Sequence, residues 1–130
     1  MIYEKIGISI QNGLLAEGII QMLSRSGEFW PFRITSSKHD GVVDSCRTQS
    51  ADILLAEVSY AALSTIDSRI AEARQLRQVC PTCKIVFLCD ENSSPEIAKE
   101  VMTAKKDGLI DYFFFSSVTT KYLAAALESL

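Results

Sequence analysis

Glu57 is the residue of this chain best placed to do chemistry. It stands at the end of the apolar run Ala51-Asp52-Ile53-Leu54-Leu55-Ala56-Glu57-Val58, which is typical of a strand buried on both faces of a parallel sheet. In open parallel sheets, ligands and reactive groups gather beyond the carboxyl ends of the strands. Glu57 therefore lies where a reactive carboxylate is expected, but the groups that would activate it are missing from the neighbouring segments.

The spacing of apolar residues predicts five strands alternating with five helices. Strands are expected at residues 5–10, 32–36, 52–58, 84–89 and 111–115. The intervening helices carry their inner faces on Leu15 to Leu23, Val42 to Cys46, Ile66 to Val79, Ile97 to Val101 and Leu123 to Leu130. Strict alternation implies an α/β fold with a parallel sheet, right-handed crossovers and helices on both faces.

Helix ends are marked by local signals. Ser94 followed by Pro95 and Glu96 predicts a helix start, because a hydroxyl caps the helix and proline fits its first turn. Thr119 or Thr120 is expected to cap the last helix, and Gly27 to end the first.

Composition indicates an ordinary globular domain spanning residues 1–130. The chain has 48% hydrophobic and 22% charged residues and a net charge of −3. Nucleic-acid binders usually carry a basic face, so no direct nucleic-acid partner is expected. The basic residues Arg69, Arg74, Arg77 and Lys84 are interpreted as parts of solvated helix surfaces.

The first residues open directly into a strand and have no signal-peptide pattern. No apolar run approaches the ~18 residues that a membrane helix needs. A cytoplasmic location and no membrane partner are therefore expected.

Three segments resemble the receiver domains of two-component response regulators. They are the first helix start, Asn12-Gly13-Leu14-Leu15-Ala16-Glu17-Gly18-Ile19, the run 51–58, and Gly108-Leu109-Ile110-Asp111-Tyr112. Among receivers, these segments are most similar to those of LuxR/NarL-type regulators. The resemblance implies a CheY-like, flavodoxin-like sheet with strand order 2-1-3-4-5. It places Glu57 on the phosphoacceptor position and Asp52 at the opposite end of the strand.

The other positions that receivers use for phosphotransfer depart from the family pattern. The acidic pair that would hold magnesium falls on Ile10 and Gln11, and magnesium prefers carboxylate oxygens. The hydroxyl after strand four is replaced by Cys89, and the lysine after strand five by Phe115. Without metal or lysine to neutralise the transferring group, no useful phosphotransfer rate is expected.

These departures predict a degenerate pseudo-receiver: not an enzyme, with no magnesium and no other cofactor or metal. It would act as a phosphorylation-independent regulatory and interaction module within two-component-type signal transduction. Its predicted partner is another protein or a second copy of the chain. The surface would be the face of helix four, strand five and helix five, with Tyr112 as the switch residue, or helices one and five. The resemblance also implies a role as the N-terminal half of a transcriptional regulator.

Two other function classes stay open. One is an atypical phosphoacceptor, and the other is a small-molecule or cysteine-redox sensor that uses a pocket near Cys89 and Phe115. Glu57 is also open to a second interpretation, as a permanent mimic of a phosphorylated aspartate.

The cysteine pair, His39 and the three consecutive phenylalanines each have a structural and a functional interpretation. Cys80-Pro81-Thr82-Cys83 has the spacing of a metal or redox motif, but it lacks the second ligand pair of a zinc site. The lone His39 is interpreted as a surface residue. At least two of Phe113, Phe114 and Phe115 are expected in the core, with Phe115 filling the vacated site.

Overall fold

The apolar runs of this chain assemble side by side into one parallel sheet. The computed structural model describes residues 3–35, 41–59, 64–89, 94–115 and 117–130. Within these residues, the sheet has five strands in the order β2-β1-β3-β4-β5, and all neighbouring strands are parallel. This is the predicted flavodoxin-like, CheY-like order.

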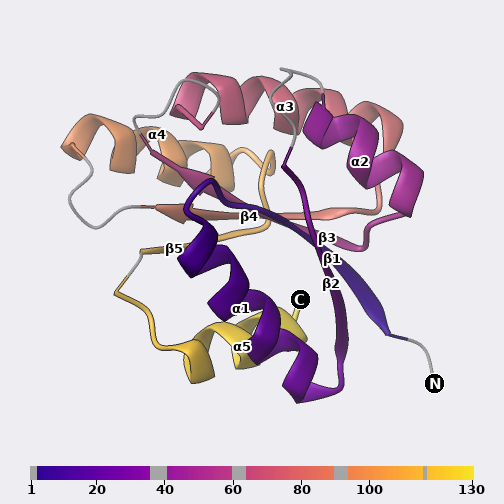
Figure 1. The fold of residues 1–130 in the computed structure, drawn as a ribbon. Coiled ribbons are helices and arrows are strands. Elements are labelled where there is room, and N and C mark those ends of the chain that lie inside the picture. The colour runs from indigo at the N-terminus through magenta and orange to yellow at the C-terminus, as the bar shows by residue number, and fades with distance from the viewer. Residues whose placement is uncertain (1–2, 36–40, 60–63, 90–93, 116) are drawn as a thin grey trace.

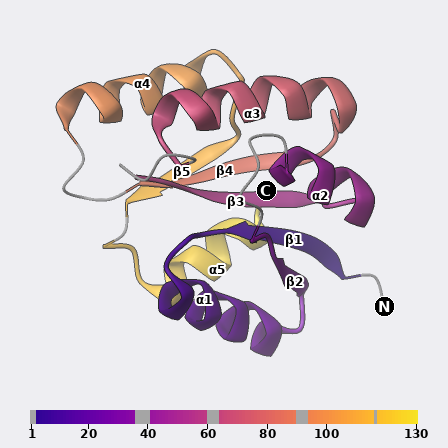
Figure 2. The ribbon, with the colours of Figure 1, turned by 45° about the horizontal axis from the view of Figure 1, so that its top comes forward.

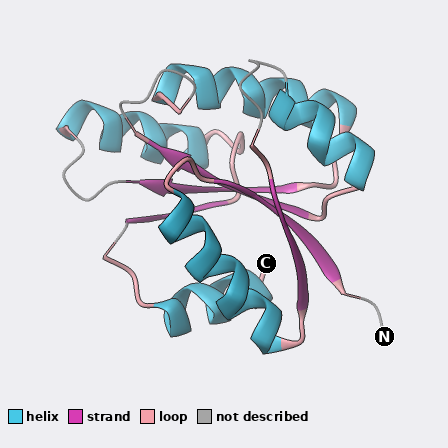
Figure 3. Ribbon diagram, viewed as in Figure 1, coloured by secondary structure: helices cyan, strands magenta, loops and turns pink. Residues whose placement is uncertain are grey.

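Strands and helices alternate along the described chain, as Figure 3 shows. The strands are β1 (Glu4–Ser9), β2 (Phe29–Arg33), β3 (Ile53–Val58), β4 (Lys84–Cys89) and β5 (Tyr112–Phe115). The helices are α1 (Gly13–Ser26), α2 (Gly41–Gln49), α3 (Ile66–Val79), α4 (Pro95–Lys106) and α5 (Thr120–Glu128).

The helices form one layer on each face of the sheet. Helices α2, α3 and α4 cover one face, and α1 and α5 cover the other (Figures 1 and 2). Each face has its own buried cluster, because successive strand residues point to opposite sides. Leu54, Ala56 and Phe87 belong to the first cluster, whereas Leu55 and Val86 belong to the second. None of the described helices is long and apolar enough to cross a bilayer.

Side-chain caps begin four of the helices. Asn12, Thr65, Ser94 and Thr119 each accept a hydrogen bond from a backbone N–H of the first turn. The predicted start of α4 with Pro95 in its first turn is confirmed, and of the two threonines expected to cap α5 it is Thr119 that does so. Gly27 ends α1 at φ 75°, a backbone conformation that glycine adopts without steric cost.

Strand β2 begins three residues earlier than predicted, at Phe29 rather than at residue 32. The expected strand excluded Pro31, but proline is tolerated on an edge strand, and β2 is an edge. The side chains after this point fold over β1 at Gly7, where an added Cβ would lie 2.9 Å from Ile34 Cδ1. Glycine at this position therefore permits the close packing of the β2 end on β1.

Strand β5 is the other edge of the sheet. The expectation that at least two of its phenylalanines lie in the core is wrong, because only Phe114 is buried. Phe113 is half-buried against the α3/α4 side, and Phe115 is exposed. An edge strand has a neighbour on one side only, so its last residue is less covered than in a central strand.

Candidate functional site

Five of the predicted site residues lie at the carboxyl edge of the sheet. Ile10 and Gln11 directly follow β1, Glu57 is the second-last residue of β3, and Cys89 and Phe115 end β4 and β5 as register partners. Tyr112 is not at this edge, because it opens β5 opposite Val86. The topology therefore places these predicted residues at one edge, as the strand order requires.

The carboxylate of Glu57 is held by backbone. Its Oε1 accepts a hydrogen bond from the Gln11 N–H at an N···O distance of 2.5 Å. The Gln11 side chain is exposed, and Ile10 is buried in the core on the α1/α5 face. Arg33 donates long hydrogen bonds of 3.5 and 3.4 Å to the carbonyls of Ile10 and Gln11. Among the described residues at this point of the edge, the Glu57 carboxylate is thus tied to the β1–α1 connection.

A buried arginine, Arg69, fills the space beneath this edge. Its side chain projects from α3 and is 3% exposed. A guanidinium has five N–H donors, and here they make five hydrogen bonds. The acceptors are Glu57 O at 2.7 Å, Ser9 Oγ at 2.9 Å, Glu72 Oε1 at 3.0 Å, Ser9 O at 3.0 Å and Ser64 Oγ at 3.2 Å. Arg69 therefore joins β1, β3, the connection before α3 and α3 itself through one fixed positive charge.

The interpretation of Arg69 as a solvated surface residue is wrong. The signal that would have identified it is the inner stripe of α3, since Ile66, Arg69, Ala73 and Leu76 follow one another at spacings of three and four residues. All four are buried. A charge on such a stripe is tolerated only where it is paired and hydrogen-bonded, and Glu72 lies one turn later at the right distance.

A second arginine, Arg77, is half-buried at the opposite edge of the sheet, where it organises the start of β5. It donates to the carbonyls of Leu109 and Cys83, each at 3.1 Å, and to Asp111 Oδ2 at 2.7 Å. The same Asp111 oxygen accepts the N–H of Ile85 at 2.7 Å. The aspartate in the receiver-like 108–112 segment is therefore structural in this chain. Asp52 also lies at this edge, directly before β3, as expected.

Cys89 and Phe115 differ in exposure. The Phe115 side chain is 39% exposed, and its ring lies edge-on to that of Phe113 at a centroid distance of 6.0 Å. Cys89 is 1% exposed, and burial raises the pKa of its thiol from 9.0 to about 11. Phe115 is thus less enclosed than a residue that fills a site, its filling role stays a prediction, and Cys89 is a neutral, inert thiol at physiological pH.

The raised pKa of Cys89 predicts a loss of stability at alkaline pH. The unfolded thiol ionises near pH 9, whereas the folded thiol stays neutral until about pH 11. The contribution of the neutral Cys89 thiol to the free energy of unfolding is thus complete below pH 9, and it is lost as the pH rises through 11. Two pKa units correspond to at most about 2.7 kcal/mol. Urea denaturation from pH 8 to 11 should show a steeper fall for the wild type than for Cys89→Ala, and parallel curves would contradict the prediction.

Tyr112 packs on the α1/α5 side of the sheet, half-buried. Its ring lies 4.9 Å from that of Phe114, and Lys105 Nζ stands 5.7 Å from its centroid. A hydrogen bond with Tyr112 raises the pKa of the exposed Tyr122 on α5. Tyr112 therefore links α4, β5 and α5, the three elements of the expected interaction face.

The remaining predicted residues lie away from the carboxyl edge or outside the description. Cys80 and Cys83 are at the opposite edge, between α3 and β4, and all four cysteines are free thiols. His39 falls outside the described residues. Among the residues that are described, no group of three or more histidine, cysteine or acidic side chains is arranged to hold a metal ion.

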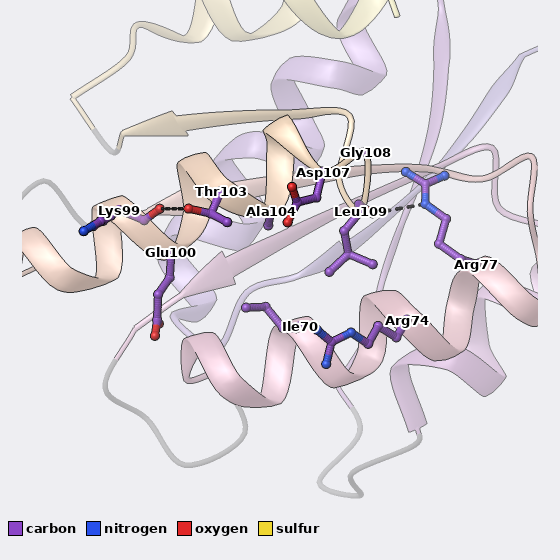
Figure 4. A pocket seen from close by; sticks show the side chains of 10 residues that line it. All are labelled: Ile70, Arg74, Arg77, Lys99, Glu100, Thr103, Ala104, Asp107, Gly108 and Leu109. Atoms are coloured by element: carbon purple, nitrogen blue, oxygen red, sulfur yellow. Dashed lines mark hydrogen bonds between the residues drawn. The ribbon is translucent and has the colours of Figure 1, made fainter.

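A separate groove of about 530 Å³ runs between α3 and α4 (Figure 4). Its volume is within the size range of small-molecule sites. Its floor is apolar and consists of Ile70, Ala104 and Leu109. Its rim carries both signs of charge, on Arg74, Lys99, Glu100 and Asp107. Mixed charge around an apolar floor suits binding rather than catalysis and selects no single ligand class.

Comparisons with solved structures agree with this topology. A LuxR-family two-component response regulator from Aurantimonas sp. SI85-9A1 superposes with a TM-score of 0.75 at 14% identity, covering 98% of this chain and 84% of that one. The chemotaxis protein CheY4 of Vibrio cholerae gives 0.74 at 13% identity and 98% of both chains. A structure described as adenylate cyclase from Rhodopirellula baltica gives 0.75 at 12% identity, covering 98% and 87%.

At the level of sequence, no protein-family model and no curated protein matches the chain. Structural identities this low establish the fold and leave the activity to the site residues. The chain therefore has the fold of response-regulator receiver domains, the CheY-like form of the flavodoxin-like fold.

Proposed function

We propose that this chain is a receiver-type signalling module whose output does not depend on phosphoryl transfer. The observation that carries this proposal is Arg69. A buried guanidinium already supplies the positive charge at the carboxyl ends of β1 and β3, with all five of its donors engaged. Phosphoryl transfer instead requires positive charge, from a metal and a lysine, that contacts the transferring group itself.

The residues around Glu57 support the same proposal. Ile10 is buried and apolar, Cys89 is a neutral buried thiol, and Phe115 has no charge. The Glu57 carboxylate is bound to the Gln11 N–H instead of facing a basic side chain of β5. We infer a site held permanently in one electrostatic state, which fits a regulatory module better than an enzyme or a magnesium-dependent switch.

A phosphorylation assay tests directly whether Glu57 can accept a phosphoryl group. The chain is incubated with acetyl phosphate and Mg²⁺, and separately melted with and without Mg²⁺ and beryllofluoride, beside a phosphorylatable receiver as positive control. We expect no phosphate incorporation and an unchanged Tm. Phosphate uptake, or a rise in Tm, that disappears in Glu57→Gln would contradict the proposal and favour an atypical phosphoacceptor.

The surface we propose for the output is the face of α4, β5 and α5. It exposes one large apolar side chain on each element: Met102 is 52% exposed, Phe115 39% and Tyr122 55%. Exposed aromatic and methionine side chains are enriched in protein interfaces. We propose that a second copy of the chain binds here. The competing surface is α1, where Leu14 is 86% exposed.

Self-association of two charge variants separates the two surfaces. Tyr122→Asp should weaken dimerisation at least tenfold in sedimentation equilibrium, since it places a charge in an apolar contact worth more than about 1.4 kcal/mol. Leu14→Asp is the matched control and should leave the dissociation constant unchanged. Loss of the dimer in Leu14→Asp alone would assign the interface to α1, and a wild-type monomer would contradict self-association.

A further inference from the structure

Three of the four cysteines gather at the amino edge of the sheet, far from Glu57. Cys46 lies on the inner face of α2, and Cys83 directly precedes β4. Both side chains are buried, whereas Cys80, just after α3, is partly exposed. Solvent thus reaches the Cys80 thiol, but not the thiols of Cys46 and Cys83.

The backbone holds Cys80 and Cys83 in a tight turn. The Cys83 N–H donates to the Cys80 carbonyl at 3.0 Å, closing the four-residue turn Cys80-Pro81-Thr82-Cys83. Such a turn keeps its first and last Cα atoms within ~7 Å. Disulfides span Cα separations up to about 6.8 Å. The turn therefore brings the two Cα atoms close to the range that a disulfide spans, with no shift of the sheet.

The surroundings of the inner thiol favour its reactive form. A hydrogen bond from the Cys46 thiol lowers the pKa of Cys83, and the nearby charge of Arg77 lowers it further. Burial and the neighbouring Cys83 raise the pKa of Cys80. The thiolate is the attacking species in disulfide exchange. Cys83 is thus prepared to attack, while Cys80 is the sulfur that an external reagent reaches.

We propose that Cys80 and Cys83 form a reversible disulfide by exchange with a low-molecular-mass disulfide such as oxidised glutathione. Cys80 attacks the reagent, gives a mixed disulfide and releases one glutathione thiolate. Cys83 then attacks the Cys80 sulfur, the mixed disulfide breaks, and the second glutathione leaves. Two protein thiols are oxidised, one glutathione disulfide is reduced, and the two protons pass to the released thiolates.

The closed disulfide would act on the fold through Arg77. The Cys83 carbonyl accepts one bond of Arg77, whose other bonds reach Leu109 and Asp111 at the start of β5. Oxidation of the turn therefore fixes a partner of the group that positions β5. Oxidation of the pair can therefore affect the position of β5 through the hydrogen bonds of Arg77.

The test uses the full chain, folded, in mixtures of oxidised and reduced glutathione. The reaction is quenched with acid, free thiols are alkylated, and the products are mapped by peptide mass spectrometry. We expect one intramolecular disulfide, between Cys80 and Cys83, that dithiothreitol reverses. Its rate should rise roughly tenfold per pH unit below the thiol pKa of Cys80, because the thiolate fraction does so.

Single variants assign each thiol. Cys83→Ser should trap glutathione on Cys80, Cys80→Ser should give neither product, and Cys89→Ala should behave as the wild type. Cys46→Ala should still form the disulfide, but the mixed disulfide on Cys80 should last longer at neutral pH, because Cys83 is then less ionised. The proposal is overturned if the mapped bond is Cys46–Cys83, if glutathione persists on Cys80 of the wild type, or if oxidation requires urea.

Discussion

Replacement of Arg69 by leucine should lower the free energy of unfolding by about 3–5 kcal/mol, the range for removing one partner of a buried ion pair. Leucine fills much of the volume but offers no donor. The Glu72 carboxylate then loses a bond of 3.0 Å, and the carbonyls of Ser9 and Glu57 lose theirs. Urea denaturation measures the change as a shift in midpoint at constant slope.

Two further variants make this result specific to the guanidinium. Arg69→Lys keeps the charge but replaces a planar fork by a single point of donation, so an intermediate loss is expected. Arg74→Leu removes an exposed arginine from the same helix and should change stability by no more than ~0.5 kcal/mol. A loss below 1 kcal/mol for Arg69→Leu would mean that the network does not support the site.

Replacement of Asp111 by alanine should cost about 3 kcal/mol. One carboxylate oxygen accepts both the Arg77 guanidinium and the Ile85 N–H, each at 2.7 Å, and bonds to charged groups are worth roughly 1.5–3 kcal/mol each without being additive. The half-buried Arg77 also loses its counter-charge. Thermal or urea unfolding measures the loss.

Asp107→Ala is the matched control for this prediction. Asp107 is exposed and lies at the C-terminal end of α4, where a negative charge is unfavourable to the helix dipole. Its removal should be neutral or slightly stabilising. Equal losses in the two variants would show that general surface charge, and not the Arg77–Asp111 contact, accounts for the effect.

Most of the architecture followed from local patterns in the sequence. The apolar runs 52–58 and 84–89 became β3 and β4 within one residue, and the Ser94-Pro95 start of α4 lies where it was predicted. These features depend on the period of hydrophobic residues and on capping hydrogen bonds within one turn. Both are local, so they can be read without the rest of the chain.

The errors arose where a residue's environment depends on its place in the sheet. The expected second strand began after Pro31, yet β2 includes this proline, which an edge strand tolerates. At least two of the phenylalanines 113–115 are expected in the core of a central strand, yet β5 is the opposite edge and only Phe114 is buried. Composition alone does not distinguish an edge strand from a central one in these short runs.

The sequence by itself determined the alternation of elements and the position of Glu57 at the carboxyl edge. Only the tertiary structure decided which side chains surround that edge. Arg69 and Ser9 are 60 residues apart in the chain, yet they share two hydrogen bonds at that edge. A buried charge is stable only when all its donors meet acceptors, and those acceptors come from segments that folding alone brings together.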